Sequence, residues 1–377
     1  KYAVLAGEQD SVFLNNSMGI LTSRDSWVYG YSKEKVIQNT QRLIQNYNSE
    51  LERLKDVPSS ERKGQLNRNA DYVNWSRKLE RLAANGFEFT YQPNGIKQSL
   101  YRPFTKKWVY HDKYLNEEAR LYFDKFGQEN LVINTTGRGS SRDFSVLVIN
   151  YLPSNDFMEK GQGFMRYDNE VDETALFQSN DNMNQSFADR LGLTLDDTFA
   201  YVYGLLNSRD YQEKYANDLK KDLARIPIVK NKEKYVEVGK ALMDLHLNYE
   251  EVPVYDGVEI TPLASPSYKV TKMKFAKKRD ENGKSVNDLS TIIFNNEITI
   301  SNIPEKAYSY MVNGRSAIEW IMDQYQVKTD KKSGITDDPN DYSSDEKYIF
   351  NLLLRIINVS LQTVDLVNSL PKFEVEE

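Results

Sequence analysis

Cysteine is absent from this 377-residue chain, and histidine occurs only twice. Without thiols the chain has no disulfide bond, no thiolate nucleophile and no cysteine-based zinc or iron–sulfur site. His111 and His246 lie far apart in the sequence, so they form no recognisable metal site or nucleophile–base pair. We therefore expect no metal site in this chain, and a structural or hydrogen-bonding role for His246.

The motifs of methyl-donor and nucleotide chemistry are missing as well. Adenine methylation needs a glycine-rich strand–turn–helix and an Asn-Pro-Pro-Tyr-like motif for the flipped base, and the chain has neither. Gly161-Gln162-Gly163 lacks the flanking strand and helix of a cofactor loop, and no Gly-x-x-x-x-Gly-Lys-Ser/Thr motif occurs. Carboxylate pairs such as Asp196-Asp197 are typical of turns or helix caps. The chain is predicted to be non-catalytic and to bind no cofactor.

Long apolar runs are also lacking. No run approaches the roughly 20 residues that cross a bilayer, and the N-terminus lacks the basic-then-apolar layout of a signal peptide. The chain begins at Lys1 without methionine. We expect a cytoplasmic location, no membrane contact, and a segment excised from a longer polypeptide.

Positive charge is in deficit over the whole chain. The net charge of −6 excludes a uniform attraction to nucleic acid, so any binding face must be built from local clusters. Acidic residues gather elsewhere, in the runs Asp168 to Glu173 and Asp337 to Glu346 and in the C-terminal tail. Hydrophobic residues make up 40% of the chain and 25 residues are tyrosines, which is enough apolar surface for a compact fold.

The most informative stretch is Tyr101 to Leu115, YRPFTKKWVYHDKYL. Aromatic rings interleaved with cations are typical of nucleic-acid binding, because bases lie against rings while cations neutralise phosphates. Its candidate DNA contacts are Arg102, Lys106, Lys107 and His111. The alternative is that Tyr101, Phe104 and Trp108 anchor the core.

A second cluster surrounds Gly137 and Gly139. Arg138 and Arg142 bracket a Gly-Ser-Ser turn, where glycine permits close backbone approach and arginine can present its fork to guanine or phosphate. With Ser140 and Ser141, this is the loop that we prefer for base reading.

The third cluster is a lysine-rich interval without acids. Its candidate DNA contacts are Lys272, Lys274, Lys277 and Lys278. On a strand, Lys272 and Lys274 would share one face and could follow phosphates. The alternative is that these lysines only keep an edge strand soluble.

Several segments resemble the C-terminal specificity region of single-chain Type ISP restriction-modification enzymes, in the same order. They are Gly19 to Lys33, the Tyr-Arg-Pro-Phe at Tyr101, Thr136 to Ser154, Phe199 to Val229, Gly239 to Glu250 and Asn302 to Asp341. The resemblance implies sequence-specific binding of duplex DNA. It also implies upstream nuclease, ATP-driven helicase or translocase and adenine-methyltransferase domains, which would be partners within one polypeptide. S-adenosylmethionine, ATP and Mg²⁺ are implied for those upstream domains only.

The apolar spacing predicts an α+β fold with a helical spacer hairpin, a mixed sheet and a C-terminal helix. Helices are expected at Ser32–Leu54, Ser59–Ala84, Phe199–Leu206, Tyr211–Leu223, Glu233–Leu247, Ile318–Tyr325 and Lys347–Leu370. Strands are expected at Leu131–Asn134, Phe144–Tyr151, Lys269–Phe275 and Ser290–Ile300.

We divide the chain into three regions. Residues 1–85 are the post-methyltransferase segment and helical spacer, 86–260 the mixed α/β target-recognition core, and 261–377 a β-hairpin with the C-terminal helical part. An alternative function is a scaffold or coupling module that docks enzyme domains without reading DNA. A self-contained DNA-modifying enzyme is disfavoured by the missing motifs.

Overall fold

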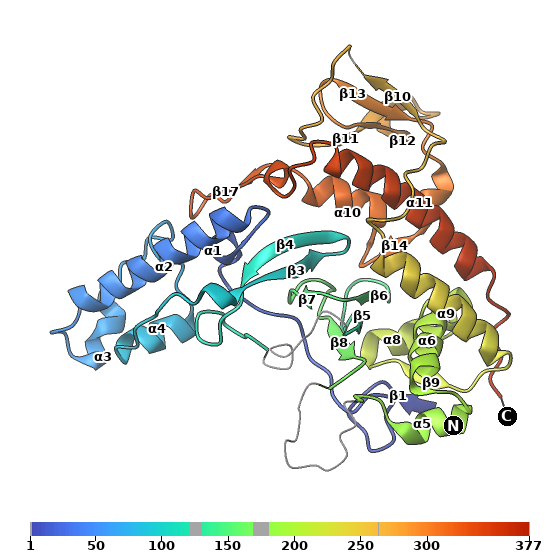
Figure 1. Cartoon of the computed structure of the whole chain (residues 1–377), viewed down its shortest axis with the longest axis horizontal. Coiled ribbons are helices and arrows are strands. Elements are labelled where there is room, and N and C mark those ends of the chain that lie inside the picture. Colours follow the sequence, from blue (N-terminus) through green and yellow to red (C-terminus); the bar gives the residue numbers. More distant parts are fainter. Residues whose placement is uncertain (1, 121–129, 169–180, 263, 377) are drawn as a thin grey trace.

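The computed structural model describes residues 2–120, 130–168, 181–262 and 264–376. Figure 1 shows a helical arm to the left, a small sheet at the top, and a helical body at the lower right where both termini lie. The fold is α+β, as predicted. Of the acidic runs, 168–173 lies almost wholly outside the described residues.

The arm begins with helix α2 (Lys33–Arg53), whose N-cap Ser32 accepts a hydrogen bond from the Lys35 backbone N–H at 3.2 Å. This helix was predicted. The continuous helix expected over 59–84 is wrong, because only α3 (Ser59–Arg62), a 3₁₀ turn and α4 (Arg77–Ala84) form there. The polar stretch between them is bonded to α2 instead, since the Asn67 backbone N–H donates to the Glu50 carboxylate at 2.6 Å and the Tyr72 carbonyl accepts from the Asn46 side-chain amide at 2.7 Å.

A four-stranded mixed sheet joins the arm to the body. Its order is β2-β4-β3-β7, and only the β3–β7 pair is parallel. The strands are β2 (Tyr29–Gly30), β4 (Thr105–Tyr110), β3 (Ile96–Arg102) and β7 (Leu152–Pro153). Together with the short helix α1 (Asp25–Val28), the sheet shares a core with α2 and α4.

The lower body packs helices against a second sheet, of order β6-β5-β8. These strands are β5 (Val132–Thr135), β6 (Val146–Ile149) and β8 (Gln162–Met165), beside a small pair of β1 (Tyr2–Val4) with β9 (Arg225–Pro227). The helices are α5 (Gln185–Leu191), α6 (Leu195–Leu206), α7 (Arg209–Lys214), α8 (Ala216–Lys221) and α9 (Lys232–Leu247). The single helix expected over 211–223 is thus two short ones.

Helices α6 and α9 cross closely because glycine stands at the contact on each. A Cβ at Gly204 would lie 2.2 Å from the Tyr235 carbonyl oxygen, and one at Gly239 would lie 2.0 Å from that of Ala200. His246, near the end of α9, is buried between the Tyr203 hydroxyl at 2.6 Å and the Thr363 hydroxyl at 2.8 Å. Burial lowers the pKa of His246 to about 3, so this histidine is a neutral structural group, as predicted.

The upper sheet has the order β10-β13-β12-β11. Its strands are β10 (Glu259–Pro262), β11 (Lys274–Arg279), β12 (Ser285–Ile293) and β13 (Ile298–Ser301). The strand expected to begin at Lys269 therefore begins at Lys274. The one expected over 290–300 is broken, because the Asn295 side chain accepts bonds from the Glu297 and Ile298 backbone N–H groups and fixes a turn.

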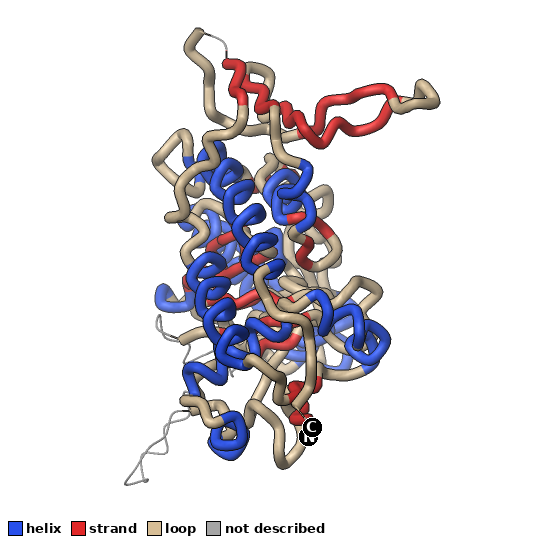
Figure 2. Tube along the Cα trace, turned by 90° about the vertical axis from the view of Figure 1, so that its right-hand side faces the viewer, coloured by secondary structure: helices blue, strands red, loops and turns tan. Residues whose placement is uncertain are grey.

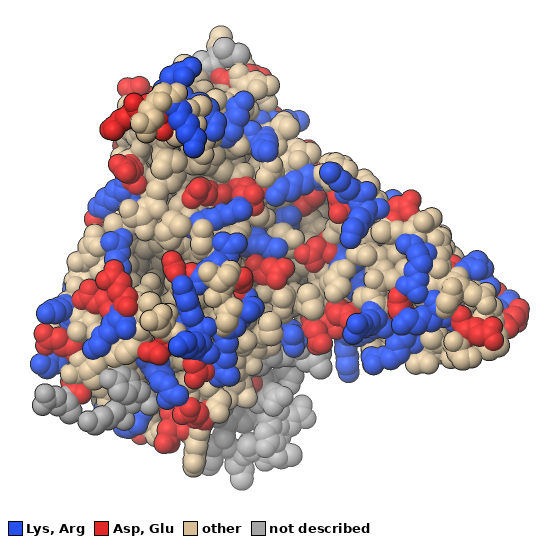
Figure 3. All heavy atoms as spheres, turned by 180° about the vertical axis from the view of Figure 1, so that it is seen from behind, with Lys and Arg blue, Asp and Glu red and all other residues tan. Residues whose placement is uncertain are grey.

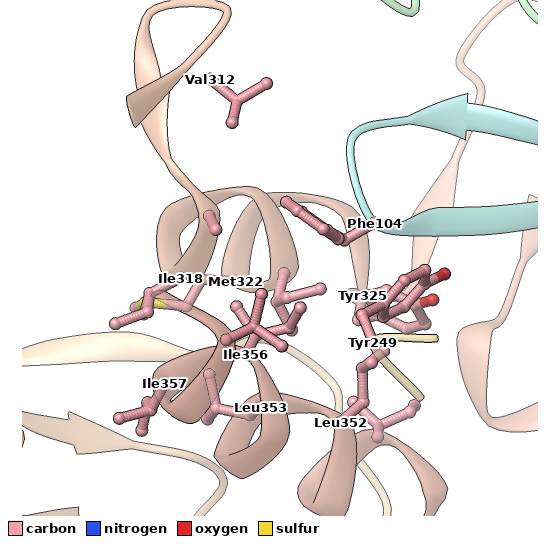
Figure 4. Close-up of a cluster of buried hydrophobic side chains, with 14 of the residues drawn as sticks. Phe104, Tyr249, Val312, Ile318, Met322, Tyr325, Leu352, Leu353, Ile356 and Ile357 are labelled. Carbon is pink, nitrogen blue, oxygen red and sulfur yellow. The ribbon is translucent and has the colours of Figure 1, made fainter. Parts of the chain in front are cut away.

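Below the upper sheet, a tight turn and two helices complete the chain. The elements are β14 (Met311–Val312), β15 (Arg315–Ser316), α10 (Ala317–Gln324), β16 (Lys328–Thr329), β17 (Thr336–Asp337) and α11 (Tyr348–Asn368). Figure 4 shows the main core, where apolar side chains of α10 and α11 face Phe104 and Tyr249. Phe104 is 1% exposed, so this ring of the aromatic stretch is a core anchor.

Helix α11 is, among the described residues, the one helix long and apolar enough to cross a membrane by length and composition. A helix was expected here, over Lys347–Leu370. However, 61% of its most apolar window is buried inside the structure, which is typical of a core helix.

Candidate nucleic-acid interface

The residues 137–142 form most of the connection between β5 and β6, and glycine lets this loop approach its neighbours closely. A Cβ at Gly137 would lie 1.7 Å from the Lys160 carbonyl oxygen. Gly139 has a φ of +72°, and its backbone N–H donates to the Lys220 carbonyl at 2.7 Å. The loop is thus fixed between the turn at 159–160 and helix α8.

The carboxylate of Glu159 holds the loop in place by hydrogen bonds. Glu159 accepts hydrogen bonds from the Ser140 hydroxyl at 2.6 Å, the Ser141 backbone N–H at 2.9 Å and the Arg142 backbone N–H at 3.1 Å. The bond from the Ser140 hydroxyl is the largest cause of a pKa near 2 for Glu159. Ser140 is buried. The two serines therefore position the loop backbone rather than point away from it.

The side chain of Arg142 lies over the turn between β14 and β15. A Cβ at Gly314 would meet the Arg142 Nη1 at 2.3 Å, and Gly314 itself has a φ of +81°. Asn313 joins this turn to the residue that holds the loop, because its side-chain oxygen accepts from the Glu159 backbone N–H at 3.0 Å. Among the described residues, no carboxylate forms an ion pair with the Arg142 guanidinium.

Arg138 in the loop and two cations beside it, Lys160 and Lys220, each have a surface partner. Arg138 lies 2.9 Å from Asp222, Lys220 lies 3.1 Å from Asp143, and the Lys160 ammonium donates to the Gly139 carbonyl at 2.6 Å. Exposed pairs of this kind contribute about 0–1 kcal/mol, so a phosphate can replace the acid at little cost.

A second group of cations continues from the β14–β15 turn. Arg315 lies 3.1 Å from Asp323, and the Lys328 ammonium donates to the Asp323 carbonyl at 2.8 Å. Burial lowers the pKa of Lys328, Asp323 opposes this, and the nearby charges of Lys107, Arg102 and Arg315 lower it further. Lys328 therefore lies within electrostatic reach of the other three cations.

A cavity of about 550 Å³ opens beside Lys328, between the arm and the β16–β17 segment. Its charged lining residues balance, with Arg102, Lys107 and Lys328 against Asp25, Asp330 and Asp337. The remaining lining residues are tyrosines, amides, hydroxyls and one isoleucine: Tyr29, Tyr31, Tyr101, Gln324, Gln326, Ser26, Thr329 and Ile335. A neutral polar cavity of this kind suits a base or a sugar better than a phosphate.

The aromatic stretch divides between this cavity and the interior. Lys107 lies 2.8 Å from Asp337, and the Arg102 guanidinium lies over the Tyr101 ring at 4.2 Å. Lys106 is buried and paired with Glu250, while His111 is buried with its Nε2 2.7 Å from the Ala119 carbonyl oxygen. Of the four candidates in the stretch, only Arg102 and Lys107 reach an open site.

The third predicted cluster lies on the upper sheet. Lys272 precedes β11 rather than sharing a strand with Lys274, so the expected common face does not form. All four lysines are exposed. Figure 3 shows the rear of the molecule, where Lys and Arg gather on the upper sheet and in a band below it, with Asp and Glu interspersed.

Comparison with known proteins gives the family. Residues 11–352 match the model described as the Type ISP C-terminal specificity domain. The chain belongs to this family. A search of curated proteins found no match.

Solved structures agree with this assignment. The chain is similar to a nuclease-deletion mutant of the Type ISP restriction-modification enzyme LlaGI in complex with a DNA substrate mimic. The two are 44% identical with a TM-score of 0.90, and the match covers 100% of this chain and 34% of that chain. It is also similar to the ATP-dependent Type ISP restriction-modification enzyme LlaBIII bound to DNA, at 38% identity and a TM-score of 0.88. That match covers 100% of this chain and 24% of that chain. A DrdV–DNA complex matches at 25% identity and a TM-score of 0.82, covering 98% of this chain and 38% of that chain. The chain therefore spans about a third or less of the two Type ISP polypeptides.

Several cations near this interface of the specificity domain stand outside the clusters that the sequence indicates. They are Lys160, Lys220, Arg315 and Lys328. The Asn313-Gly314 dipeptide was the available signal for Arg315, because it marks a turn that presents the next side chain. No cluster of three or more potential metal ligands occurs in the part of the chain that the structure describes.

Proposed function

We propose that this chain recognises a specific sequence in duplex DNA through the 137–142 loop and the β14–β15 turn. The observation that carries the proposal is the Arg142 guanidinium, which has no acidic partner among the described residues and is supported by a loop that Glu159 fixes. The DNA-bound enzymes LlaGI and LlaBIII, to which the chain is similar, support the same proposal.

Arginine at a fixed turn is suited to base reading. Its planar fork matches the O6 and N7 acceptors of guanine in the major groove, and a good bidentate contact discriminates by about 1–3 kcal/mol. Arg142 and Arg315 are the two candidates, since each lies at the turn that Gly314 forms. Arg138, Lys160 and Lys220 would exchange their surface partners for phosphates and set the register.

The cavity next to Lys328 would take a base edge or sugar at the border of the interface. Gln324, Gln326 and Thr329 supply donors and acceptors, while the balanced charges disfavour phosphate. Arg102 and Lys107 would fix the rim of the cavity. Lys106 and His111, which face the interior, have no place in this interface.

The chemistry of the whole enzyme would belong to other domains of a longer cytoplasmic polypeptide. We infer that adenine-methyltransferase and helicase–nuclease domains lie upstream and use S-adenosylmethionine, ATP and Mg²⁺. Within the chain, residues 1–85 would lead from the methyltransferase, 86–260 would form the recognition core, and 261–377 would add the upper sheet and C-terminal helix.

Selection from a randomised duplex pool tests the proposal. The purified chain would be incubated with the pool at low and near-physiological salt, and the retained DNA sequenced. We expect enrichment of one asymmetric site that survives added salt. Retention without enrichment at either salt concentration would overturn base reading and favour a module that only docks enzyme domains.

A further inference from the structure

The β11–β12 hairpin, which we call the ribbon (Lys274–Ile293), extends beyond the upper sheet. Strand β12 pairs with β13 only through Ile292 and Ile293, while its first half, Ser285–Asp288, pairs with β11 alone. Figure 2 shows the two strands running out from the top of the molecule, away from the helices and toward the rear face. The outer half of the ribbon is therefore a two-stranded element with no sheet beside it.

Positive charge is concentrated here, in a chain that is negative overall. Seven cations lie in and just before the ribbon: Lys269, Lys272, Lys274, Lys277, Lys278, Arg279 and Lys284. Three acids lie in the same interval. Asp280 accepts the Asn282 and Lys284 backbone N–H groups at the tip, and Asp288 lies 3.5 Å from Lys278. Glu281 is exposed at the tip.

The strand register places these cations on both faces of the ribbon. Lys277 and Arg279 pair with Asn287 and Ser285 on one face, while Lys278 pairs with Val286 on the other. Lys277, Lys278 and Arg279 are all exposed, so neither face of the outer half covers a core. A hairpin without such a face is marginally stable alone. Lysines that only protect a sheet edge would not need to stand on both faces of a projecting element.

The base of the ribbon adjoins the proposed interface. The Phe275 ring lies 5.9 Å from the Tyr308 ring. Tyr308 is in the 3₁₀ turn (Glu305–Ser309) that leads into β14 and the β14–β15 turn. The ribbon also projects over the rear face, on which Figure 3 shows the band of Lys and Arg.

We propose that the ribbon enters the major groove of the duplex beside the sequence read by the 137–142 loop, an inference that rests on the proposed function. The major groove is about 12 Å wide and admits a two-stranded ribbon, whereas the minor groove, about 6 Å wide, is too narrow. A groove has a phosphate wall on each side, which matches cations on both faces. Glu281, at the tip, would lie away from both phosphate walls. The ribbon thus adds affinity for flanking DNA.

Salt dependence of binding tests the inference. The full chain would be compared with the triple variant Lys277→Gln, Lys278→Gln, Arg279→Gln on the duplex that the pool selection enriches. We expect the slope of log K against log salt to fall by about 2–3 in magnitude, because each lost phosphate contact removes about 0.9. The preferred sequence should stay the same. The matched control replaces Lys55, Lys63 and Arg68 on the helical arm with glutamine and should leave the slope unchanged.

A modified duplex identifies the groove. Glucosylated 5-hydroxymethylcytosine, placed in the flank on either side of the site, fills the major groove there. We expect it to weaken wild-type binding about tenfold on one side only, and to leave the triple variant unaffected. An unchanged slope in the triple variant, or insensitivity of wild type to both modified flanks, would overturn the ribbon inference while sequence enrichment still stands. Absence of any DNA binding would instead overturn the proposed function.

Discussion

The 137–142 loop and the ribbon carry similar side chains in opposite settings. The loop is tied to Glu159 and Lys220 by hydrogen bonds, and Glu159 in turn donates its backbone N–H to Asn313. The ribbon is held at its base, and its outer half is exposed on both faces. Rigid support suits the discrimination of bases, which needs fixed geometry, whereas a cation on an exposed ribbon suits phosphates, which are the same at every position. Basic character alone therefore does not tell the two roles apart.

The largest expected effect is on stability, and it concerns a cation in the interior, Lys106. Replacing Lys106 with methionine leaves the partly buried Glu250 without its cation and should lower the free energy of unfolding by about 3 kcal/mol. Chemical denaturation measures this. Lys277→Met on the ribbon is the control and should change stability by less than about 0.5 kcal/mol. Lower DNA affinity of Lys106→Met at unchanged stability would contradict the assignment of Lys106 to the interior.

Arg142→Ala tests whether the 137–142 loop reads bases. We expect the preference at one base pair to fall by about 1–3 kcal/mol, while binding to scrambled duplex changes little. Arg142→Lys should not restore the preference, because an ammonium lacks the planar fork. Competition binding against single-base variants of the enriched site measures both, with the exposed Arg81→Ala on the arm as control. An equal loss on every sequence would make Arg142 a phosphate contact.

Acid sensitivity reports on the support of the loop. The pKa of Glu159 is lowered to about 2, chiefly by the hydrogen bond from Ser140. A depressed carboxyl pKa stabilises the fold above the unfolded value, near 4.5, and this contribution is lost as pH falls toward 2. Melting temperatures between pH 5 and pH 2 should therefore fall more steeply in wild type than in Glu159→Gln. The contribution of His246 is common to both proteins and cancels. Parallel curves would show that Glu159 does not hold the loop.

The smallest expected effect is that of one ribbon lysine. Lys277→Gln should reduce the magnitude of the salt slope by about 1 and leave the preferred sequence unchanged. Fluorescence anisotropy over a range of salt concentrations resolves such a change. A shift in base preference without a change in slope would transfer a reading role to the ribbon.

Local features of the fold were predictable from the sequence. Ser32 and the apolar spacing after it define α2, and the glycines around Arg138 mark a loop of close backbone approach. The break within 59–84 was not predictable, because this stretch is bonded to another helix, as in the hydrogen bonds from Asn67 to Glu50 and from Asn46 to Tyr72. Local propensity cannot register contacts of that kind.

The candidate site also depends on contacts between residues that are far apart in the sequence. Lys106 and Lys107 are neighbours in one basic stretch, but Lys106 meets Glu250, 144 residues away, and Lys107 meets Asp337, 230 residues away. These distant acids decide which cation is internal. Arg315 was missed for a similar reason, since its importance comes from the contact between its turn and the 137–142 loop.

The most direct measurement is a paired titration of Arg142→Ala and the Lys277→Gln, Lys278→Gln, Arg279→Gln variant on enriched and scrambled duplexes across a salt series. Arg142→Ala is expected to lose about 1–3 kcal/mol of the difference between the two duplexes and to keep most of the salt slope. The ribbon variant is expected to keep the whole difference and to lose slope. If both variants changed slope and preference together, the division between a base-reading loop and a phosphate-binding ribbon would be contradicted.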